Sequence, residues 1–176
     1  SALLVDYRGY GPSTGKPSEA GTHADAEAAW QHLTEGRRIP PGRIVIFGES
    51  LGGAVAARLA ARNQPASLVL HSAFTSAPDL AADLYPFLPA RLLTRFAYDT
   101  LASVKASHCP LLVAHSPQDE IVPVTHGRRL YEAATGPKQW MELAGSHNDG
   151  FIFMRTEWAH QFGEFLQRHL PAQAAV

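Results

Sequence analysis

A serine set among closely spaced glycines is the first group in this chain whose position suggests chemistry. The segment Gly48-Glu49-Ser50-Leu51-Gly52-Gly53 lies between the apolar run Ile44–Phe47 and a stretch with apolar residues at helical spacing. The pattern G-x-S-x-G, in the order strand, tight turn, helix, is typical of a nucleophile held on a strained turn. We therefore expect Ser50 to carry a nucleophilic hydroxyl; the alternative is that Ser50 only caps the helix.

The backbone of this turn would serve such a nucleophile in two ways. Gly48 and Gly52 are expected to remove side chains that would collide with the neighbouring strand and helix. The backbone N–H of Leu51 is expected to point, with the start of the helix, toward the oxyanion that develops when a carbonyl is attacked.

A serine hydroxyl needs a base, and the base needs an acid that orients it. Asp119 follows the apolar run Leu111–Ala114, and His147 lies in a short polar segment after the last apolar run. Serine, acid and histidine thus follow one another in the order that accompanies G-x-S-x-G. Glu120 is the rival acid, but it is expected to point elsewhere on its loop. The sequence predicts a triad of Ser50, Asp119 and His147.

The other eight of the nine histidines receive less specific interpretations. Five fall on or beside predicted helices and are expected at the surface: His23, His32, His126, His160 and His169. Three lie at strand edges, where backbone groups could satisfy them, and the first and last of these could border a pocket: His71, His108 and His115. No pair has a zinc-binding spacing, and Cys109 is the single cysteine, so the sequence predicts no metal, no cofactor and no intrachain disulfide.

Short apolar runs alternate with helical patterns along the chain. The runs are Leu3-Leu4-Val5, Ile44-Val45-Ile46-Phe47, Leu68-Val69-Leu70, Leu111-Leu112-Val113-Ala114 and a weaker one at Trp140-Met141-Glu142-Leu143. The first four are apolar throughout, which suits strands that are covered on both faces. The alternation predicts an α/β fold, a doubly wound and mostly parallel sheet, in a single domain over residues 1–176.

Residues 72–107 form a longer connection than a simple crossover needs. Bulky apolar residues occur throughout its middle, from Leu80 to Phe96. Two interpretations stay open: a long connecting helix with core residues, or a small cap or helical insertion over a pocket.

Composition excludes several functions. The chain has 176 residues, 45% of them hydrophobic, and a formal net charge of -1, so no nucleic-acid surface is expected. No apolar run approaches the roughly 20 residues that span a bilayer, so no transmembrane segment is expected. The compartment is open, although a single cysteine favours a cytoplasmic setting.

Four separated motifs together resemble one branch of the α/β-hydrolases, the Bem46-like and ABHD-type proteins. They are Asp6-Tyr7-Arg8-Gly9-Tyr10-Gly11, the segment around Ser50, Asp119-Glu120-Ile121-Val122-Pro123 and Gly145-Ser146-His147-Asn148-Asp149. The resemblance covers nearly the whole chain. It implies a serine hydrolase that cleaves small-molecule carboxylic esters or thioesters through an acyl-enzyme on Ser50, without a cofactor.

The chain departs from that branch at its beginning. Full-length members carry three strands before the one that Leu3–Val5 resembles, and the loop after the third holds the second oxyanion donor. The resemblance therefore implies an N-terminally truncated core with an open sheet edge. Three explanations remain open: residues upstream of Ser1, direct pairing of Leu3–Val5 with Ile44–Phe47, or a second copy. If the chain is complete, we expect a homo-oligomer.

Two other functions remain alternatives. One is a non-catalytic binding protein on a hydrolase scaffold, because a fold does not fix a function. The other is the catalytic core of a serine peptidase, since some peptidases share this core.

Overall fold

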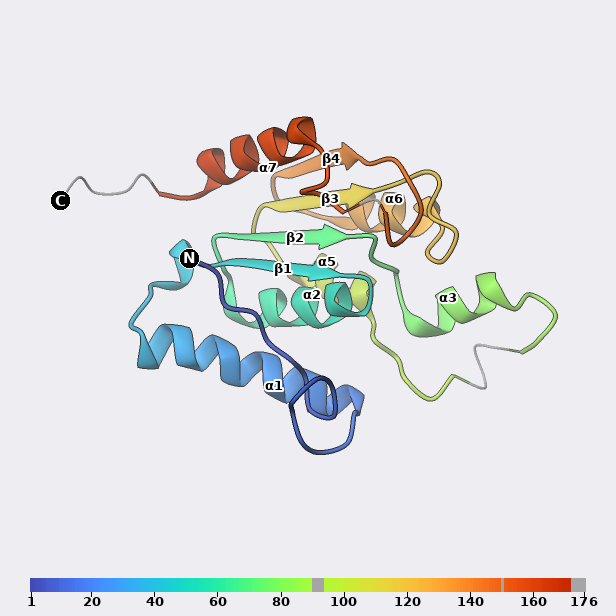
Figure 1. Ribbon diagram of the computed structural model, residues 1–176, viewed down its shortest axis with the longest axis horizontal. Helices are drawn as coiled ribbons and strands as arrows, with labels where there is room; N and C mark the ends of the chain where they lie inside the picture. The colour runs from blue at the N-terminus through green and yellow to red at the C-terminus, as the bar shows by residue number, and fades with distance from the viewer. Residues whose placement is uncertain (90–93, 150, 172–176) are drawn as a thin grey trace.

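Four parallel strands form the sheet at the centre of the molecule (Figure 1). The computed structural model describes residues 1–89, 94–149 and 151–171, and the strand order within them is β1-β2-β3-β4. The strands are β1 (Val45–Glu49), β2 (Ser67–His71), β3 (Leu111–His115) and β4 (Lys138–Glu142). Each matches a predicted apolar run to within a residue or two, and the predicted parallel sheet is confirmed.

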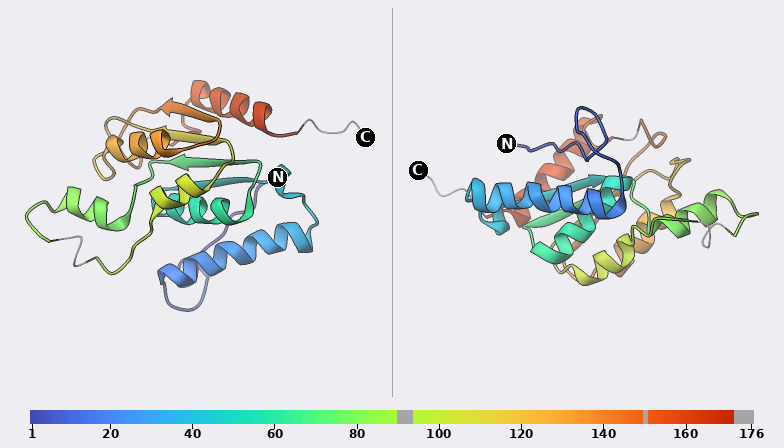
Figure 2. Two further views of the ribbon diagram at one scale, coloured as in Figure 1. Left: turned by 180° about the vertical axis from the view of Figure 1, so that it is seen from behind. Right: turned by 90° about the horizontal axis from the view of Figure 1, so that it is seen from below.

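Helices cover both faces of this sheet. They are α1 (Glu19–Gln31), α2 (Leu51–Asn63), α3 (Ala77–Leu84), α5 (Thr100–Ala106), α6 (Val124–Ala133) and α7 (Thr156–His169). Figure 2 shows α2, α5 and α6 on one face and α7 on the other, with α1 beside α2. In the described part of the chain, no helix has both the length and the apolarity needed to cross a membrane.

The two faces of β2 and β3 explain why these strands are apolar throughout. Successive side chains of a strand point to opposite faces. Leu68 and Leu70 belong to the core under α2, α5 and α6, whereas Val69 and Leu112 pack with Phe165 of α7. Because both faces are buried, no polar alternation is left.

The predicted strand Leu3–Val5 is wrong. Residues 1–7 contain no strand, and Leu4 is 92% exposed. A strand needs a neighbour for its backbone groups, and this segment does not pair with β1, which stays at the edge of the described sheet. Leu3, Leu4 and Val5 instead line a cavity of about 310 Å³ together with residues of α1, β1 and α2.

Residues 72–107 contain two helices with different surroundings. In Figures 1 and 2, α3 extends beyond the carboxyl ends of the strands, while α5 lies against α2. Several large apolar residues around the end of α3 are exposed: Leu84, Tyr85, Phe87, Leu88 and Phe96. Residues 90–93 of this stretch lie outside the described residues. That the stretch is a cap stays a prediction.

Candidate active site

Ser50 occupies the sharp turn between β1 and α2. Its backbone angles are φ 49° and ψ -117°, a sparsely populated region that costs a non-glycine residue on the order of 1–3 kcal/mol. The Ser50 N–H donates to the carbonyl of His71 at 2.9 Å, which ties the turn to the end of β2. The hydroxyl makes no capping bond to α2. Ser50 thus occupies the N-cap position of α2, but its side chain does not cap the helix.

Close packing explains one of the two predicted glycines of this turn. A Cβ on Gly48 would overlap the carbonyl oxygen of Gly52 and lie 2.6 Å from the Cβ of Ala56. A Cβ on Gly52 would meet only the Tyr7 hydroxyl, at an ordinary 3.8 Å, so the expected collision there is wrong. The second tight position is Gly53, where a Cβ would lie 2.7 Å from that of Ala73.

Asp119 and His147 come together from two separate loops. Asp119 lies in the loop after β3 and His147 in the loop after β4, and carboxyl ends of parallel strands lie at one edge of the sheet. The Nδ1 of His147 lies 2.8 Å from Oδ2 and 3.0 Å from Oδ1 of Asp119. Nδ1–H therefore donates to the carboxylate, and in a neutral imidazole this tautomer leaves the lone pair on Nε2 to accept a proton.

The Asp119 carboxylate is held by more than His147. Its Oδ1 accepts hydrogen bonds from the N–H groups of Ile121 and Val122, at 3.1 and 2.8 Å, and the Nε2 of His115 lies 3.4 Å from Oδ2. Burial alone would raise the pKa of Asp119. The hydrogen bonds from His115, from the Val122 N–H and from His147 outweigh burial and hold this pKa well below its usual range. Asp119 therefore stays ionised, as an orienting acid must.

Glu120 has a different role. Its Oε2 accepts the backbone N–H of His147 at 3.0 Å and does not touch the imidazole. Glu120 is exposed, whereas Asp119 is buried. The geometry thus favours Asp119 as the partner of the imidazole, with Glu120 helping to fix the backbone of the histidine loop.

The hydrogen bond between the proposed nucleophile and the proposed base is missing from the described contacts. Within the described residues, the Ser50 hydroxyl has no hydrogen bond to His147, although both residues stand at the same edge of the sheet. Such bonds are often long without substrate and tighten when it binds. The role of the Leu51 N–H at the oxyanion stays a prediction.

Two buried histidines bear on their sequence interpretation. The Nε2 of His115 lies 2.9 Å from the backbone carbonyl of Val122, so a backbone group satisfies it as expected, and the same atom lies 3.4 Å from Oδ2 of Asp119. His126 was expected at the surface but is fully buried, where its Nδ1 accepts the N–H of Thr75 at 3.1 Å. His126 precedes Leu130 by about one helical turn, so both lie on the buried face of α6. That spacing is a sequence signal that could have predicted the burial of His126.

Known proteins resemble this chain over most of its length. Residues 2–169 match a family model described as alpha/beta hydrolase fold. An uncharacterised protein of Mycobacterium tuberculosis is 47% identical over 150 residues, covering 85% of this chain and 53% of that protein. The human alpha/beta hydrolase domain-containing protein 17C is 34% identical over 169 residues, covering 94% and 49%. The chain spans about half the length of these relatives.

Solved structures share the arrangement of strands and helices. The esterase Pf2001 of Pyrococcus furiosus matches 94% of this chain and 68% of its own, with a TM-score of 0.76 at 22% identity. A monoacylglycerol lipase of Paleococcus ferrophilus matches 93% and 80%, with a TM-score of 0.61 at 21% identity. At such identities the likeness shows the fold alone. The family match over residues 2–169 settles the classification: the chain belongs to the alpha/beta hydrolase fold family, as its resemblance to ABHD-type proteins implied.

Proposed function

We propose that this protein is a serine hydrolase that cleaves carboxylic esters or thioesters through an acyl-enzyme on Ser50. The observation that carries the proposal is the 2.8 Å bond between His147 and a buried, ionised Asp119, at the sheet edge where Ser50 stands on its strained turn. An imidazole oriented in this way is the base that a serine hydroxyl requires. The names of two structural neighbours, an esterase and a lipase, point to the same class.

The proposed reaction has two steps. The Ser50 Oγ attacks the acyl carbonyl carbon, His147 Nε2 takes the hydroxyl proton, and the bond to the leaving alcohol or thiol breaks as His147 returns that proton to it. Water then attacks the acyl-serine in the same way, which releases the carboxylic acid and restores Ser50. Asp119 stabilises the imidazolium in both steps without taking its proton. The steps use protein groups and water only.

The backbone of α2 would supply part of the oxyanion stabilisation. The Leu51 N–H lies at the start of this 13-residue helix, where backbone donors and the helix dipole favour negative charge. Exposed apolar residues near the end of α3, such as Tyr85 and Phe87, suit an acyl chain. They support an ester with an apolar acyl group rather than a strongly charged substrate.

Covalent labelling tests the proposal directly. The protein, its Ser50→Ala variant and a Ser103→Ala control on α5 are exposed to a fluorophosphonate, and their intact masses are compared. We expect one adduct in the protein and in the control, none in Ser50→Ala, and a loss of ester hydrolysis of about 10⁴-fold or more in that variant.

Three results would contradict the proposal. Equal labelling of Ser50→Ala and of the unsubstituted protein would remove Ser50 as the nucleophile. A folded protein that takes no adduct and hydrolyses neither p-nitrophenyl butyrate nor an acyl thioester would leave the binding-protein alternative. Cleavage of an acylated peptide, but of neither ester, would favour the peptidase alternative.

A further inference from the structure

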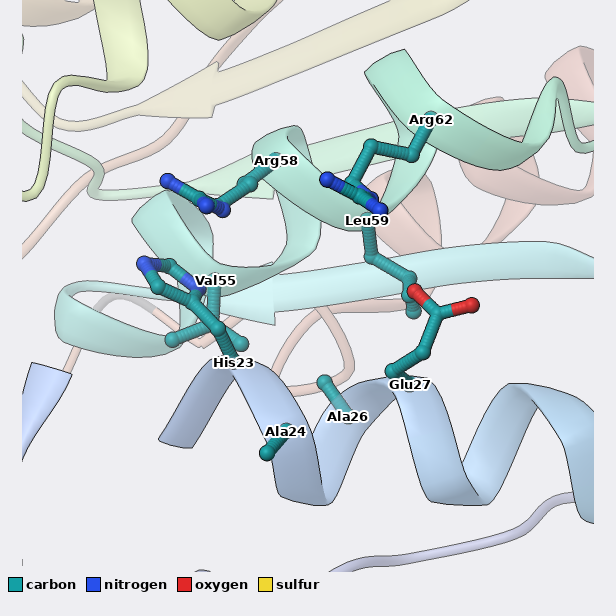
Figure 3. Close-up of a pocket in the computed structure, with 8 residues that line it drawn as sticks. All are labelled: His23, Ala24, Ala26, Glu27, Val55, Arg58, Leu59 and Arg62. Carbon is teal, nitrogen blue, oxygen red and sulfur yellow. The ribbon is translucent and has the colours of Figure 1, made fainter. Parts of the chain in front are cut away.

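A second cavity, with charged and apolar residues in its lining, lies on the outer side of α2, away from the turn that carries Ser50. It has a volume of about 210 Å³ and is formed between α1 and the later turns of α2 (Figure 3). His23 and Glu27 contribute from α1, Arg58 and Arg62 from α2, and Val55 and Leu59 add apolar surface. This cavity plays no part in the hydrolase mechanism.

Positive charge exceeds negative charge in this cavity. Arg58 and Arg62 are four residues apart on α2, so their side chains share one face of the helix. Within the described residues neither guanidinium forms an ion pair, and the Glu27 carboxylate accepts a hydrogen bond from Asn63 at 3.2 Å. Two guanidinium groups therefore face one carboxylate that is already engaged. Guanidinium groups match the geometry of carboxylate and phosphate oxygens.

His23 leaves one buried polar atom without a partner. Its Nδ1 is buried and has no hydrogen bond in the described part of the chain, while its Nε2 lies 3.9 Å from Glu19. The ring reaches from α1 toward Arg58 (Figure 3) and packs against Tyr98 at 5.7 Å between ring centroids. Burial and the nearby Arg58 charge lower the pKa of His23, despite the opposing effect of Glu19. An unsatisfied buried nitrogen is unfavourable, and a ligand oxygen would satisfy it.

We propose that this cavity binds a small oxyanion, a carboxylate or a phosphate group, between Arg58, Arg62 and His23. The two guanidinium groups hold the anionic oxygens, and the Nδ1 of His23 donates one further hydrogen bond once the ring is protonated. Val55 and Leu59 contact a short apolar part of the ligand. The proposal is independent of the chemistry at Ser50.

Magnetic resonance titration of the full chain tests the site. Inorganic phosphate is added in one series and butyrate in another, at constant ionic strength kept with sodium chloride, while the imidazole signals of His23 and the backbone signals of α1 and α2 are followed. Concentrations up to about 50 mM cover dissociation constants in the millimolar range. We expect saturable shifts confined to these two helices and a rise in the His23 pKa, because a bound anion stabilises the imidazolium.

Matched variants separate a site from general screening. Replacing both arginines, Arg58→Gln with Arg62→Gln, should weaken binding at least tenfold, whereas Arg43→Gln, an exposed arginine elsewhere, should leave it unchanged. His23→Phe keeps the ring packing and should weaken binding severalfold. Saturation with phosphate alone would identify a phosphate site, and saturation with both anions a general oxyanion site.

Three outcomes would overturn the proposal. The first is that the shifts saturate with neither anion. The second is that the double variant Arg58→Gln with Arg62→Gln binds as tightly as the unsubstituted protein, and the third is that Arg43→Gln loses as much affinity as that double variant. If the double variant unfolds, the conservative pair Arg58→Lys and Arg62→Lys decides the question. It keeps the charge but not the forked geometry, so undiminished binding in that pair would also contradict the proposed arginine contacts.

Discussion

The two halves of the candidate active site are built in different ways. On the β3–β4 side, the Asp119 carboxylate contacts two imidazoles and two backbone N–H groups. On the β1 side, the Ser50 side chain makes no capping bond and its position depends on a strained backbone and on close glycine packing. Hydrogen bonds thus hold Asp119 and His147 in place, whereas backbone conformation and close packing of glycines hold Ser50.

The surroundings of the two halves differ as well. β3 has a neighbouring strand on both sides, whereas β1 stands at the edge of the described sheet. The cavity beside β1 reaches residues of the turn itself, including Gly48, Glu49 and Gly52. Substitutions of Asp119 should therefore act mainly on chemistry, whereas substitutions of the closely packed glycines beside Ser50 should act on folding first.

The largest effect is expected from Asp119→Asn. The amide can no longer accept the Nδ1 proton as a carboxylate does, so the imidazole loses its orientation and its charge stabilisation. We expect kcat/KM for an ester to fall about 10⁴-fold, while circular dichroism still shows a folded protein. An activity within tenfold of the unsubstituted protein would remove Asp119 from the triad.

Gly48→Ala tests the steric half of the comparison. Its new methyl group would meet the Gly52 carbonyl and the Ala56 side chain, and neither the turn nor α2 can move without disturbing β1. We expect a loss of unfolding free energy of about 2–4 kcal/mol in urea denaturation. Gly42→Ala is the matched control, because a Cβ there has no neighbour within 4 Å. Equal stability of both variants would contradict the steric account.

Acid should weaken the hydrogen-bonded half. The pKa of Asp119 is lower in the folded protein than its usual value, although burial opposes this. Its stabilisation is therefore complete above the unfolded-state pKa of about 4 and is lost as the pH falls through the folded-state pKa. Below about pH 4, we expect the unfolding free energy of the unsubstituted protein to decline more steeply with falling pH than that of Asp119→Asn.

The difference between the two curves of unfolding free energy against pH gives the contribution of the Asp119 carboxylate. Hydrogen bonds from Arg8 also lower the pKa of Asp25, which adds a contribution of the same sign to both proteins. Parallel curves would mean that the folded-state pKa of Asp119 is not lowered.

The smallest effect is expected from Glu120→Gln. Its side chain accepts only the His147 backbone N–H among the described contacts, and the amide oxygen of glutamine can accept the same bond. We expect kcat/KM to change about threefold or less. A loss as large as that of Asp119→Asn would contradict the assignment of Glu120 to the backbone of the histidine loop alone.

Much of this site could be predicted because its signals are local. The order strand, G-x-S-x-G, helix is contained in about twenty consecutive residues, and the apolar runs of β2 and β3 needed no knowledge of their partners. Leu3–Val5 shows the limit of that reasoning. Its apolar character resembles a strand, but a strand forms only where a neighbour accepts its backbone bonds, and here β1 does not pair with it.

The sequence by itself determined the residue types, their chain order and the parallel sheet that gathers Ser50, Asp119 and His147 at one edge. The tertiary structure alone decided which groups touch. It placed His115 within 3.4 Å of Asp119, buried His126 in a hydrogen bond with Thr75, and made Gly53, rather than Gly52, the second closely packed glycine after Gly48. The reason is physical: periodicity fixes the face on which a side chain lies, but contacts across loops depend on how those faces pack together.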